Sequence, residues 1–194
     1  NFSSSLRSIL RQDPDVLLIG EIRDEETADI AVKFALTGHL VFSTVHANDA
    51  PSTIARLLDL GIPPFLLGSS LNLIMAQRLV RTIDVDNKEP YKPTDNELNQ
   101  INISKAEAKK VKFFTGKPTS NNHNTGYKGR TAIHEILEVN SEMKNLIFEN
   151  SSANDIKKLA TKNGMTPLRD AGINKIKDGV TTIEEVLRAT VEDV

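Results

Sequence analysis

A short apolar run that ends abruptly in acidic residues constrains the fold of this chain more than any other feature. Residues 16–19 read Val-Leu-Leu-Ile, all of which suit a strand, and residues 20–24 read Gly-Glu-Ile-Arg-Asp. Because the run has no polar alternation, we expect both of its faces to be buried, as in a central strand of a parallel sheet. Glu21 then follows the carboxyl end of that strand, where ligands bind in open α/β sheets.

The residues that follow alternate between helix and strand patterns. Apolar residues recur at helical spacing over 25–36, residues 40–45 form a second apolar strand, and a further helix is expected over 52–60. Such alternation predicts a parallel sheet with right-handed crossovers. Glu21 and His46 are therefore expected side by side at one edge of that sheet.

The two histidines of this region stand at opposite ends of the second predicted strand. His39 and His46 are seven positions apart, and an odd separation places side chains on opposite faces of a regular strand. We therefore do not expect them to share one ligand. His46, at the carboxyl end near Glu21, is the better candidate for an active site, and His39 fits a structural role.

Composition restricts the class of protein. The 194 residues, 39% of them hydrophobic, are enough for one large domain or two small ones. The formal net charge of −2 gives no strong attraction to nucleic acid, so no nucleic-acid partner is expected. No segment has the pattern of a membrane-spanning helix or a signal peptide, so no direct membrane insertion is expected. The most apolar stretch, residues 65–79, is predicted to be a buried helix.

Local patterns predict the remaining elements. Residues 130–139 alternate in part, which favours a strand, and Thr182 begins a capping box with Glu185. Further helices are expected over residues 97–101, 104–111, 141–148, 152–163, 166–177 and 183–191.

Five segments of the chain form a recognisable set. They read Leu-Arg-Ser-Ile-Leu-Arg-Gln-Asp-Pro-Asp at 6–15, Gly-Glu-Ile-Arg-Asp at 20–24, Thr-Gly-His-Leu-Val-Phe-Ser-Thr-Val-His-Ala-Asn at 37–48, Ala-Gln-Arg-Leu-Val-Arg at 76–81 and Thr-Gly-Tyr-Lys-Gly-Arg-Thr at 125–131. Together they resemble one family, the hexameric ATPases that drive type II secretion and type IV pilus assembly (the secretion protein E family). The resemblance continues into the C-terminal helices and covers nearly the whole chain.

The resemblance implies an α/β fold with three parts. Residues 1–81 would be the C-terminal part of a RecA-like P-loop ATPase domain, a parallel sheet with flanking helices that carries the family's Walker B and His boxes. Residues 82–125 would be a small polar insertion, equivalent to the family's zinc-binding subdomain. Residues 126–194 would add a strand and a C-terminal helical subdomain.

The resemblance also implies a motor that uses ATP and Mg²⁺ and powers pseudopilus or pilus assembly. Its partners would be further copies in a homo-hexamer and the inner-membrane platform and adaptor proteins of a secretion or pilus machine. Such a protein would be cytoplasmic and peripheral at the inner membrane. Secretion, pilus-assembly and DNA-uptake machines share these motifs. A non-catalytic oligomerisation or docking module of the same systems stays open as an alternative.

The family's motifs assign roles to particular residues. Gly20-Glu21 resembles the Walker B box, so Glu21 would hold the hydration shell of Mg²⁺, and His46 would respond to the γ-phosphate. An arginine near these motifs can stabilise phosphate charge across a subunit boundary, or it can pair with an acid to fix a loop. The further candidates for nucleotide binding are Arg7, Arg11, Arg23 and His39.

The phosphate-binding loop of such ATPases is missing from this sequence. No Gly-x-x-x-x-Gly-Lys-Ser/Thr run occurs, and that run supplies the backbone N–H groups and the lysine that hold phosphates. The family's acidic box before Walker B is also missing. We therefore expect a C-terminal fragment of a longer ATPase, inactive by itself.

The insertion departs from the family pattern because the chain contains no cysteine. Many family members carry two Cys-x-x-Cys pairs that bind a structural Zn²⁺, and the resemblance places Asp84, Asn87, Thr119 and Asn122 at those positions. Asparagine and threonine are poor Zn²⁺ ligands. Asp84 and His123 could bind a metal with other oxygen ligands, but a zinc-free insertion with its own small core is the favoured interpretation.

Overall fold

The computed structural model of this chain describes residues 8, 12 and 14–190 and divides into two compact units. The first unit comprises Asn1–Met75 and Ile136–Met165, and the second comprises Ala76–Glu135 and Thr166–Val194. The chain passes from the first unit to the second within β3 (Leu73–Ile83) and returns within β6 (Tyr127–Glu138), which pairs with β3. The segment that was expected as one C-terminal subdomain is thus shared between the two units.

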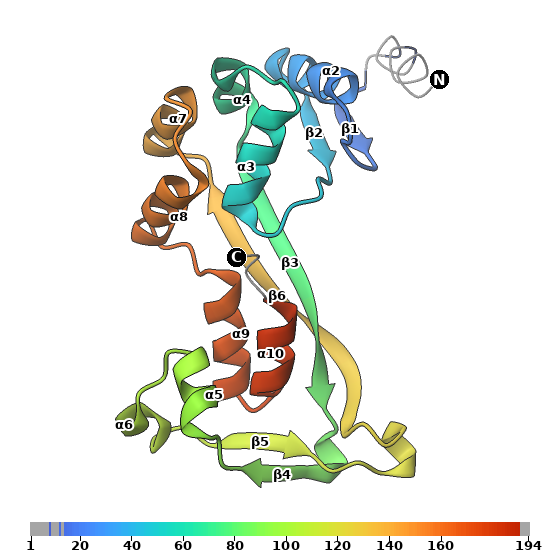
Figure 1. Ribbon diagram of the computed structural model, residues 1–194. Helices are drawn as coiled ribbons and strands as arrows, with labels where there is room; N and C mark the ends of the chain where they lie inside the picture. Colours follow the sequence, from blue (N-terminus) through green and yellow to red (C-terminus); the bar gives the residue numbers. More distant parts are fainter. Residues whose placement is uncertain (1–7, 9–11, 13, 191–194) are drawn as a thin grey trace. The chain divides into compact units, whose positions relative to one another are not determined.

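The first unit contains the predicted parallel strand pair (Figure 1). β1 (Val16–Ile19) runs parallel to β2 (Leu40–Ser43), and α2 (Glu25–Leu36) connects them. α2 begins after Asp24, whose carboxylate accepts a hydrogen bond from Thr27 N at 2.8 Å and so satisfies a free donor of the first turn. The alternation of strand and helix that the sequence predicts is therefore confirmed here.

One face of this strand pair is exposed, although both faces were expected to be buried. Leu17 and Ile19 are only 6% and 1% exposed and point into the unit. The apolar row on the opposite face consists of Val16, Leu18, Leu40 and Phe42, which are 54, 75, 47 and 54% exposed. The expectation was wrong for this chain because an uninterrupted apolar run does not by itself state how many layers cover the strand, and no described residues cover this row.

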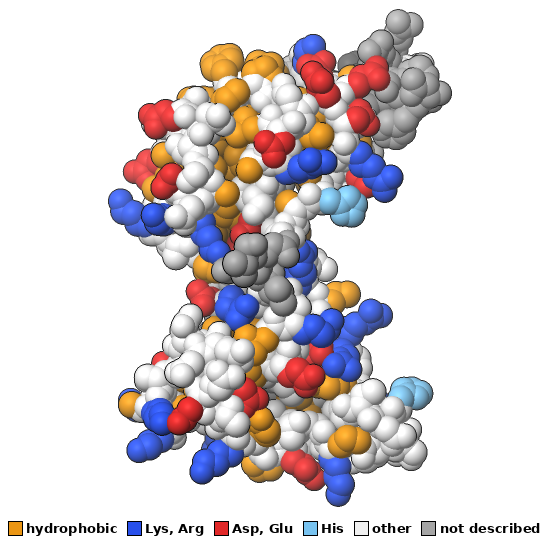
Figure 2. Space-filling model, viewed as in Figure 1, with side chains coloured by type: hydrophobic (Ala, Val, Ile, Leu, Met, Phe, Trp, Pro, Cys, Tyr) orange, Lys and Arg blue, Asp and Glu red, His pale blue; other side chains and the backbone are white. Residues whose placement is uncertain are grey.

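Helices form the rest of the first unit. α4 packs on α7 and α3 packs on α8. Gly68 lets α4 approach α7 closely, because a Cβ at this position would lie 2.6 Å from the ring of Phe148. Figure 2 shows apolar side chains at the surface over α4, where Phe65 is 69% exposed. These helices are α3 (Ala50–Asp59), α4 (Pro64–Ser70), α7 (Ser141–Phe148) and α8 (Ala153–Lys162).

Residues 65–79 do not form the single buried helix that was expected. α4 ends at Ser70, the backbone at Leu71 is extended, and β3 then runs from Leu73 to Ile83. Gly68, Ser69 and Ser70 form the last turn of α4 and Asn72 follows it, and all of these residue types are weak helix formers at the point where the helix ends. The apolar residues beyond them fit a strand equally well, and pairing with β6, far along the chain, decides between the two.

The second unit joins the insertion to the C-terminal helices. β4 (Lys88–Tyr91) pairs antiparallel with β5 (Phe113–Gly116). Two short turns flank this pair, η1 (Val85–Asn87) and η2 (Ser120–Asn122). The helices of this unit are α5 (Asp95–Gln100), α6 (Lys105–Ala108), α9 (Leu168–Lys177) and α10 (Ile183–Ala189).

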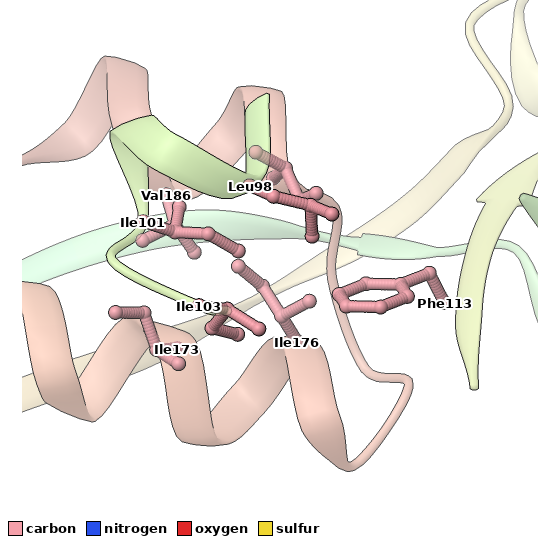
Figure 3. Close-up of a cluster of buried hydrophobic side chains, with 8 residues drawn as sticks. Leu98, Ile101, Ile103, Phe113, Ile173, Ile176 and Val186 are labelled. Atoms are coloured by element: carbon pink, nitrogen blue, oxygen red, sulfur yellow. The ribbon is translucent and has the colours of Figure 1, made fainter. Parts of the chain in front are cut away.

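The main core of the second unit brings the insertion and the C-terminal helices together (Figure 3). The insertion was expected to have a small core of its own, but buried side chains of α9 and α10 complete that core, so the expectation was wrong. Helical periodicity identifies an apolar face without identifying its partner. The buried residues are Leu98, Ile101, Ile103, Phe113, Ile173, Ile176, Ile183 and Val186.

The surface carries both signs of charge. Figure 2 shows positive and negative side chains interspersed on the visible face of each unit, in keeping with the formal net charge of −2. None of the helices in the described residues is long and apolar enough to cross a membrane.

Candidate functional site

The acid and the imidazole that the sequence singled out lie together. Glu21 follows β1 and His46 follows β2, and Glu21 Oε2 lies 3.2 Å from His46 Nε2. The other carboxylate oxygen, Oε1, lies 2.5 Å from Nη2 of Arg23. The structure therefore brings three of the predicted site residues to the carboxyl end of the strand pair, where ligands bind in open α/β sheets.

Backbone contacts beyond the two strands hold this end together. Ile22 N donates to Thr44 O at 2.9 Å, and the hydroxyl of Thr44 donates to Gly20 O at 2.6 Å. These bonds continue the pairing of β1 and β2 after the regular strands end. The positions of Glu21 and His46 are thus set by the sheet rather than by their own side-chain contacts.

Glu21 is held as a carboxylate. The hydrogen bond from Arg23 lowers the pKa of Glu21 below its ordinary value, and the charges of Arg23 and His46 lower it further. Its Oε2 atom faces His46 Nε2 at 3.2 Å, and this contact also lowers the pKa of Glu21. A carboxylate at the end of a strand suits the binding of a metal ion through water.

His39 belongs to a different environment. Its ring stacks on Phe34 with a centroid separation of 4.0 Å, and its Nδ1 lies 3.0 Å from the hydroxyl of Thr37. These contacts fix His39 at the C-terminal end of α2, and β2 lies between it and His46. The structure does not bring His39 to Glu21. Arg7 and Arg11 lie outside the described residues.

The residues placed by the resemblance at the family's cysteine positions also lie together. Asp84 and Asn122 are each 1% exposed. Asp84 Oδ2 accepts hydrogen bonds from Asn87 Nδ2 at 2.7 Å and Asn122 Nδ2 at 2.9 Å, and Asn122 Oδ1 accepts one from Thr119 N at 2.8 Å. The bonds from Asn122 and Asn87 lower the pKa of Asp84. The carboxylate of Asp84 and the amides of Asn87 and Asn122 therefore satisfy one another, whereas the buried hydroxyl of Thr119 has no hydrogen-bond partner among the described residues.

The described residues hold no cluster of three or more His, Asp or Glu side chains that could bind a metal ion. Asp84 is the only carboxylate of the hydrogen-bonded group, and His123, beside Asn122 in the chain, has an exposed side chain. The side chains of Asp84, Asn87 and Asn122 form a hydrogen-bonded group that we call the polar clasp. This arrangement favours a structural role over a metal site, because two of these three side chains are amides.

Sequence reasoning missed a buried ion pair in the second unit. Glu185 was expected to complete the capping box that begins at Thr182, and Thr182 Oγ1 does accept from Glu185 N at 3.3 Å. The Glu185 carboxylate instead binds Arg81 Nη2 at 2.6 Å and Arg188 Nη2 at 2.9 Å. The only signal in the sequence was an acid within an apolar helical pattern, which does not identify its partner.

Comparison with known proteins agrees with this fold. The paired parallel strands, the crossover helix and the acid at the strand end define an α/β domain with a candidate ligand site at the carboxyl end of its strands. A family model described as "Type II/IV secretion system protein" matches residues 1–188. The chain belongs to this family.

Relatives of two kinds are similar to the chain at nearly the same level. The type IV pilus assembly ATPase PilB of Thermus thermophilus is 44% identical over 98% of this chain and 22% of the relative. The type II secretion system protein E of Pseudomonas aeruginosa is 46% identical over 99% of this chain and 38% of the relative. The chain therefore spans well under half the length of these curated relatives.

Solved structures share the same fold. The pilus retraction motor PilT, determined with bound ADP, matches 99% of this chain and 44% of its own chain at 28% identity and a TM-score of 0.68. The ATPase DotB of Legionella pneumophila matches 96% of this chain at 22% identity and a TM-score of 0.64, which supports the fold alone.

Proposed function

We propose that the protein containing this chain is an ATP-hydrolysing motor that powers pilus assembly or type II secretion. The observation that carries the proposal is the meeting of Glu21, Arg23 and His46 at the carboxyl end of the two parallel strands. The names of the relatives add support, because both the pilus and the secretion proteins are described as components of such machines. Their nearly equal identities do not favour one machine over the other.

The residues present suit a Mg²⁺-nucleotide complex. Bound Mg²⁺ neutralises phosphate charge. Glu21 presents a partly exposed carboxylate at the end of β1 that would accept from the water shell of the metal ion. His46 is 87% exposed beside it and would face the γ-phosphate, and Arg23 supplies a second positive charge. Phosphoryl transfer needs such positioning and charge neutralisation more than covalent chemistry.

The phosphate grip would come from outside these 194 residues, because the sequence holds no phosphate-binding loop. We therefore expect the chain by itself to bind ATP weakly and not to hydrolyse it. In the longer protein, residues 1–81 would complete the ATPase domain, and residues 82–125 and 126–194 would be the insertion and the C-terminal subdomain. The assembly we propose is a homo-hexamer that meets platform and adaptor proteins at the cytoplasmic side of the inner membrane.

The test is Glu21→Gln in the full-length protein. An amide of the same shape cannot offset metal charge, so ATP turnover should fall by about a hundredfold or more. Circular dichroism and the oligomeric state should not change. Asp29→Asn is the matched control, because it removes an exposed carboxylate that pairs only with Lys33 on α2, and it should leave turnover unchanged.

Unchanged turnover in the Glu21→Gln protein would remove Glu21 from the mechanism. A full-length protein without ATPase activity, which nevertheless assembles with its partners, would support the non-catalytic docking module instead.

A further inference from the structure

A small cavity in the second unit is walled by aromatic and acidic side chains. Its volume is about 100 Å³, well below the roughly 300 Å³ at which pockets for whole small molecules begin. A cavity of this size takes one end group of a larger molecule. The side chains that line it include Tyr91, Glu97, Phe114, Tyr127, Ile183 and Glu184.

The fold explains why these side chains converge. Tyr91 ends β4 opposite Phe113 on β5. Because strand side chains alternate between faces, Phe113 enters the core of the second unit, as Figure 3 shows, while Phe114 lines the cavity. Tyr127 begins β6, and Ile183 begins α10. The aromatic rings of Tyr91 on β4, Phe114 on β5 and Tyr127 on β6 therefore all line the cavity.

Two carboxylates contribute negative charge. Glu97 is fixed, because its carboxylate accepts from the hydroxyl of Tyr91 at 2.8 Å and from Thr94 N at 2.8 Å. Glu184 has no hydrogen bond or ion pair within the described part of the chain. The pKa of Tyr91 is raised chiefly by its hydrogen bond to Glu97, and the pKa of Tyr127 chiefly by burial, and the charge of Glu184 adds to both. The charge of Glu184 therefore reaches the cavity.

The protein's own cations already contact two of the three rings. The guanidinium carbon of Arg81 lies 4.2 Å from the centroid of Tyr127, and Lys88 Nζ lies 4.2 Å from the centroid of Phe114. Arg81 shares the buried carboxylate of Glu185 with Arg188. Tyr91 is 38% exposed, and no cation of the described residues lies over its ring. A ring beside two carboxylates is a favourable place for a further cation.

We propose that this cavity binds the guanidinium group of an arginine side chain that another protein presents. A guanidinium is planar, so it can stack on Tyr91 and at the same time donate N–H groups to Glu184 or Glu97. An ammonium group lacks this planar fork and should bind less well. The small volume fits the tip of a side chain rather than a free metabolite.

The chain provides its own reporter for a test. It contains two tyrosines and no tryptophan, and both tyrosines line the cavity. Tyrosine fluorescence of the 194-residue chain would be followed while N-acetyl-arginine amide is added. We expect a saturable change that is weaker with N-acetyl-lysine amide and absent with the uncharged N-acetyl-citrulline amide. The same addition to free tyrosine amide should give no saturation.

Variants of the chain distinguish binding of the arginine probe in this cavity from a general effect of the protein's negative charge. Glu184→Gln should weaken the affinity for the arginine probe by about fivefold, the loss of one exposed ion pair. Tyr91→Ala should weaken it by about tenfold, with Tyr127 still reporting. Glu149→Gln is the matched control, because it removes an exposed glutamate of the first unit and should leave the affinity unchanged.

Circular dichroism would show whether each variant remains folded. If Tyr91→Ala unfolds the chain, Tyr91→Phe replaces it, because phenylalanine keeps the aromatic ring. Tyr91→Phe should bind within about twofold of the unaltered chain, because it retains the stacking surface. The proposal would be overturned by the absence of a saturable signal, by equal affinity for the citrulline probe, or by equal effects of Glu184→Gln and Glu149→Gln.

Discussion

At the scale of single residues, the strongest electrostatic feature is the buried carboxylate of Glu185. Its side chain is fully buried, and it accepts hydrogen bonds from Arg81 Nη2 at 2.6 Å and from Arg188 Nη2 at 2.9 Å. Burial alone would raise the pKa of Glu185, but the hydrogen bonds from Arg188 and Arg81 outweigh it and hold the pKa at about 2. The neighbouring Glu184 is exposed and lies outside this network.

We expect this carboxylate to make stability depend on pH. Its pKa falls from 4.5 to about 2 on folding, so its contribution is complete above pH 4.5 and is lost as the pH falls toward 2. A shift of this size corresponds to roughly 3 kcal/mol. Glu185→Gln should therefore destabilise the chain by about 3 kcal/mol at pH 7 and by only about 1 kcal/mol at pH 3. Urea unfolding at several pH values measures this difference.

Glu184→Gln is the control for that experiment, because it changes an adjacent exposed glutamate that acts on Arg81 and Arg188 only through its charge and makes no hydrogen bond to them. Its effect on the free energy of unfolding should stay within about 0.5 kcal/mol at either pH. A Glu185→Gln protein whose loss of stability did not change between pH 7 and pH 3 would contradict the assignment of this pKa.

At the scale of elements, local sequence located the main helices but missed three strands, since β3 was expected to be part of a helix and no strand was expected at β4 or β5. The limits expected for the helix after β1, residues 25–36, agree with those of α2. A helix was expected from residue 104, and the hydroxyl of Ser104 caps α6 by accepting from Glu107 N at 3.2 Å. Both depend on neighbours within one turn. β3 was mistaken for a helix because its partner strand lies far along the chain.

The approach of Gly116 to Gly126 is a second feature that the chain's local pattern did not reveal. A Cβ on Gly116 would lie 1.7 Å from Gly126 O, and a Cβ on Gly126 would lie 2.2 Å from Gly116 O. Gly126 also has φ of +78°, a conformation that L side chains rarely adopt. The end of β5 and the start of β6 can therefore meet only when both positions lack a side chain.

Gly126→Ala should consequently destabilise the chain by about 2 kcal/mol or more, from backbone strain and the contact with Gly116 together. Gly20→Ala is the matched control, because no atom lies within 4 Å of the added carbon and its φ is not positive. It should cost less than about 1 kcal/mol in unfolding free energy. Urea unfolding of both variants checks this, and losses of similar size would argue against the close approach.

At the scale of the whole molecule, the second unit is held by apolar and polar contacts between segments distant in sequence. The core joins α5 and β5 to α9 and α10. The polar clasp of Asp84, Asn87 and Asn122 joins η1 to η2. In the first unit, by contrast, the exposed apolar row on β1 and β2 shows that the described residues supply only one of the layers that such strands usually have.

Because the clasp satisfies its own hydrogen bonds, we expect the purified chain to contain no stoichiometric Zn²⁺. A chelator should not change its melting temperature, and added Zn²⁺ should not raise it. Asp84→Ala is the informative variant, since it leaves the amides of Asn87 and Asn122 without their shared acceptor and should lower stability by about 1–3 kcal/mol. Elemental analysis that found about one Zn per chain would overturn this expectation.

The sequence by itself determined the strand–helix–strand order, the limits of α2 and α7 and the meeting of Glu21 with His46. Each of these follows from short-range periodicity, from helix caps, or from the rule that parallel strands end on the same edge of a sheet. Arg23 was a candidate for nucleotide binding, and its ion pair with Glu21 was not predicted.

Only the tertiary structure decided the strand identity of residues 73–79, the exposed face of β1 and β2, the shared core of the insertion and the partners of Glu185. All four depend on which surface meets another one distant in the sequence. The local sequence around an apolar or charged residue is the same whichever residue it contacts in the folded chain. Periodicity and composition therefore indicate that such a residue needs a contact, but they do not identify the partner.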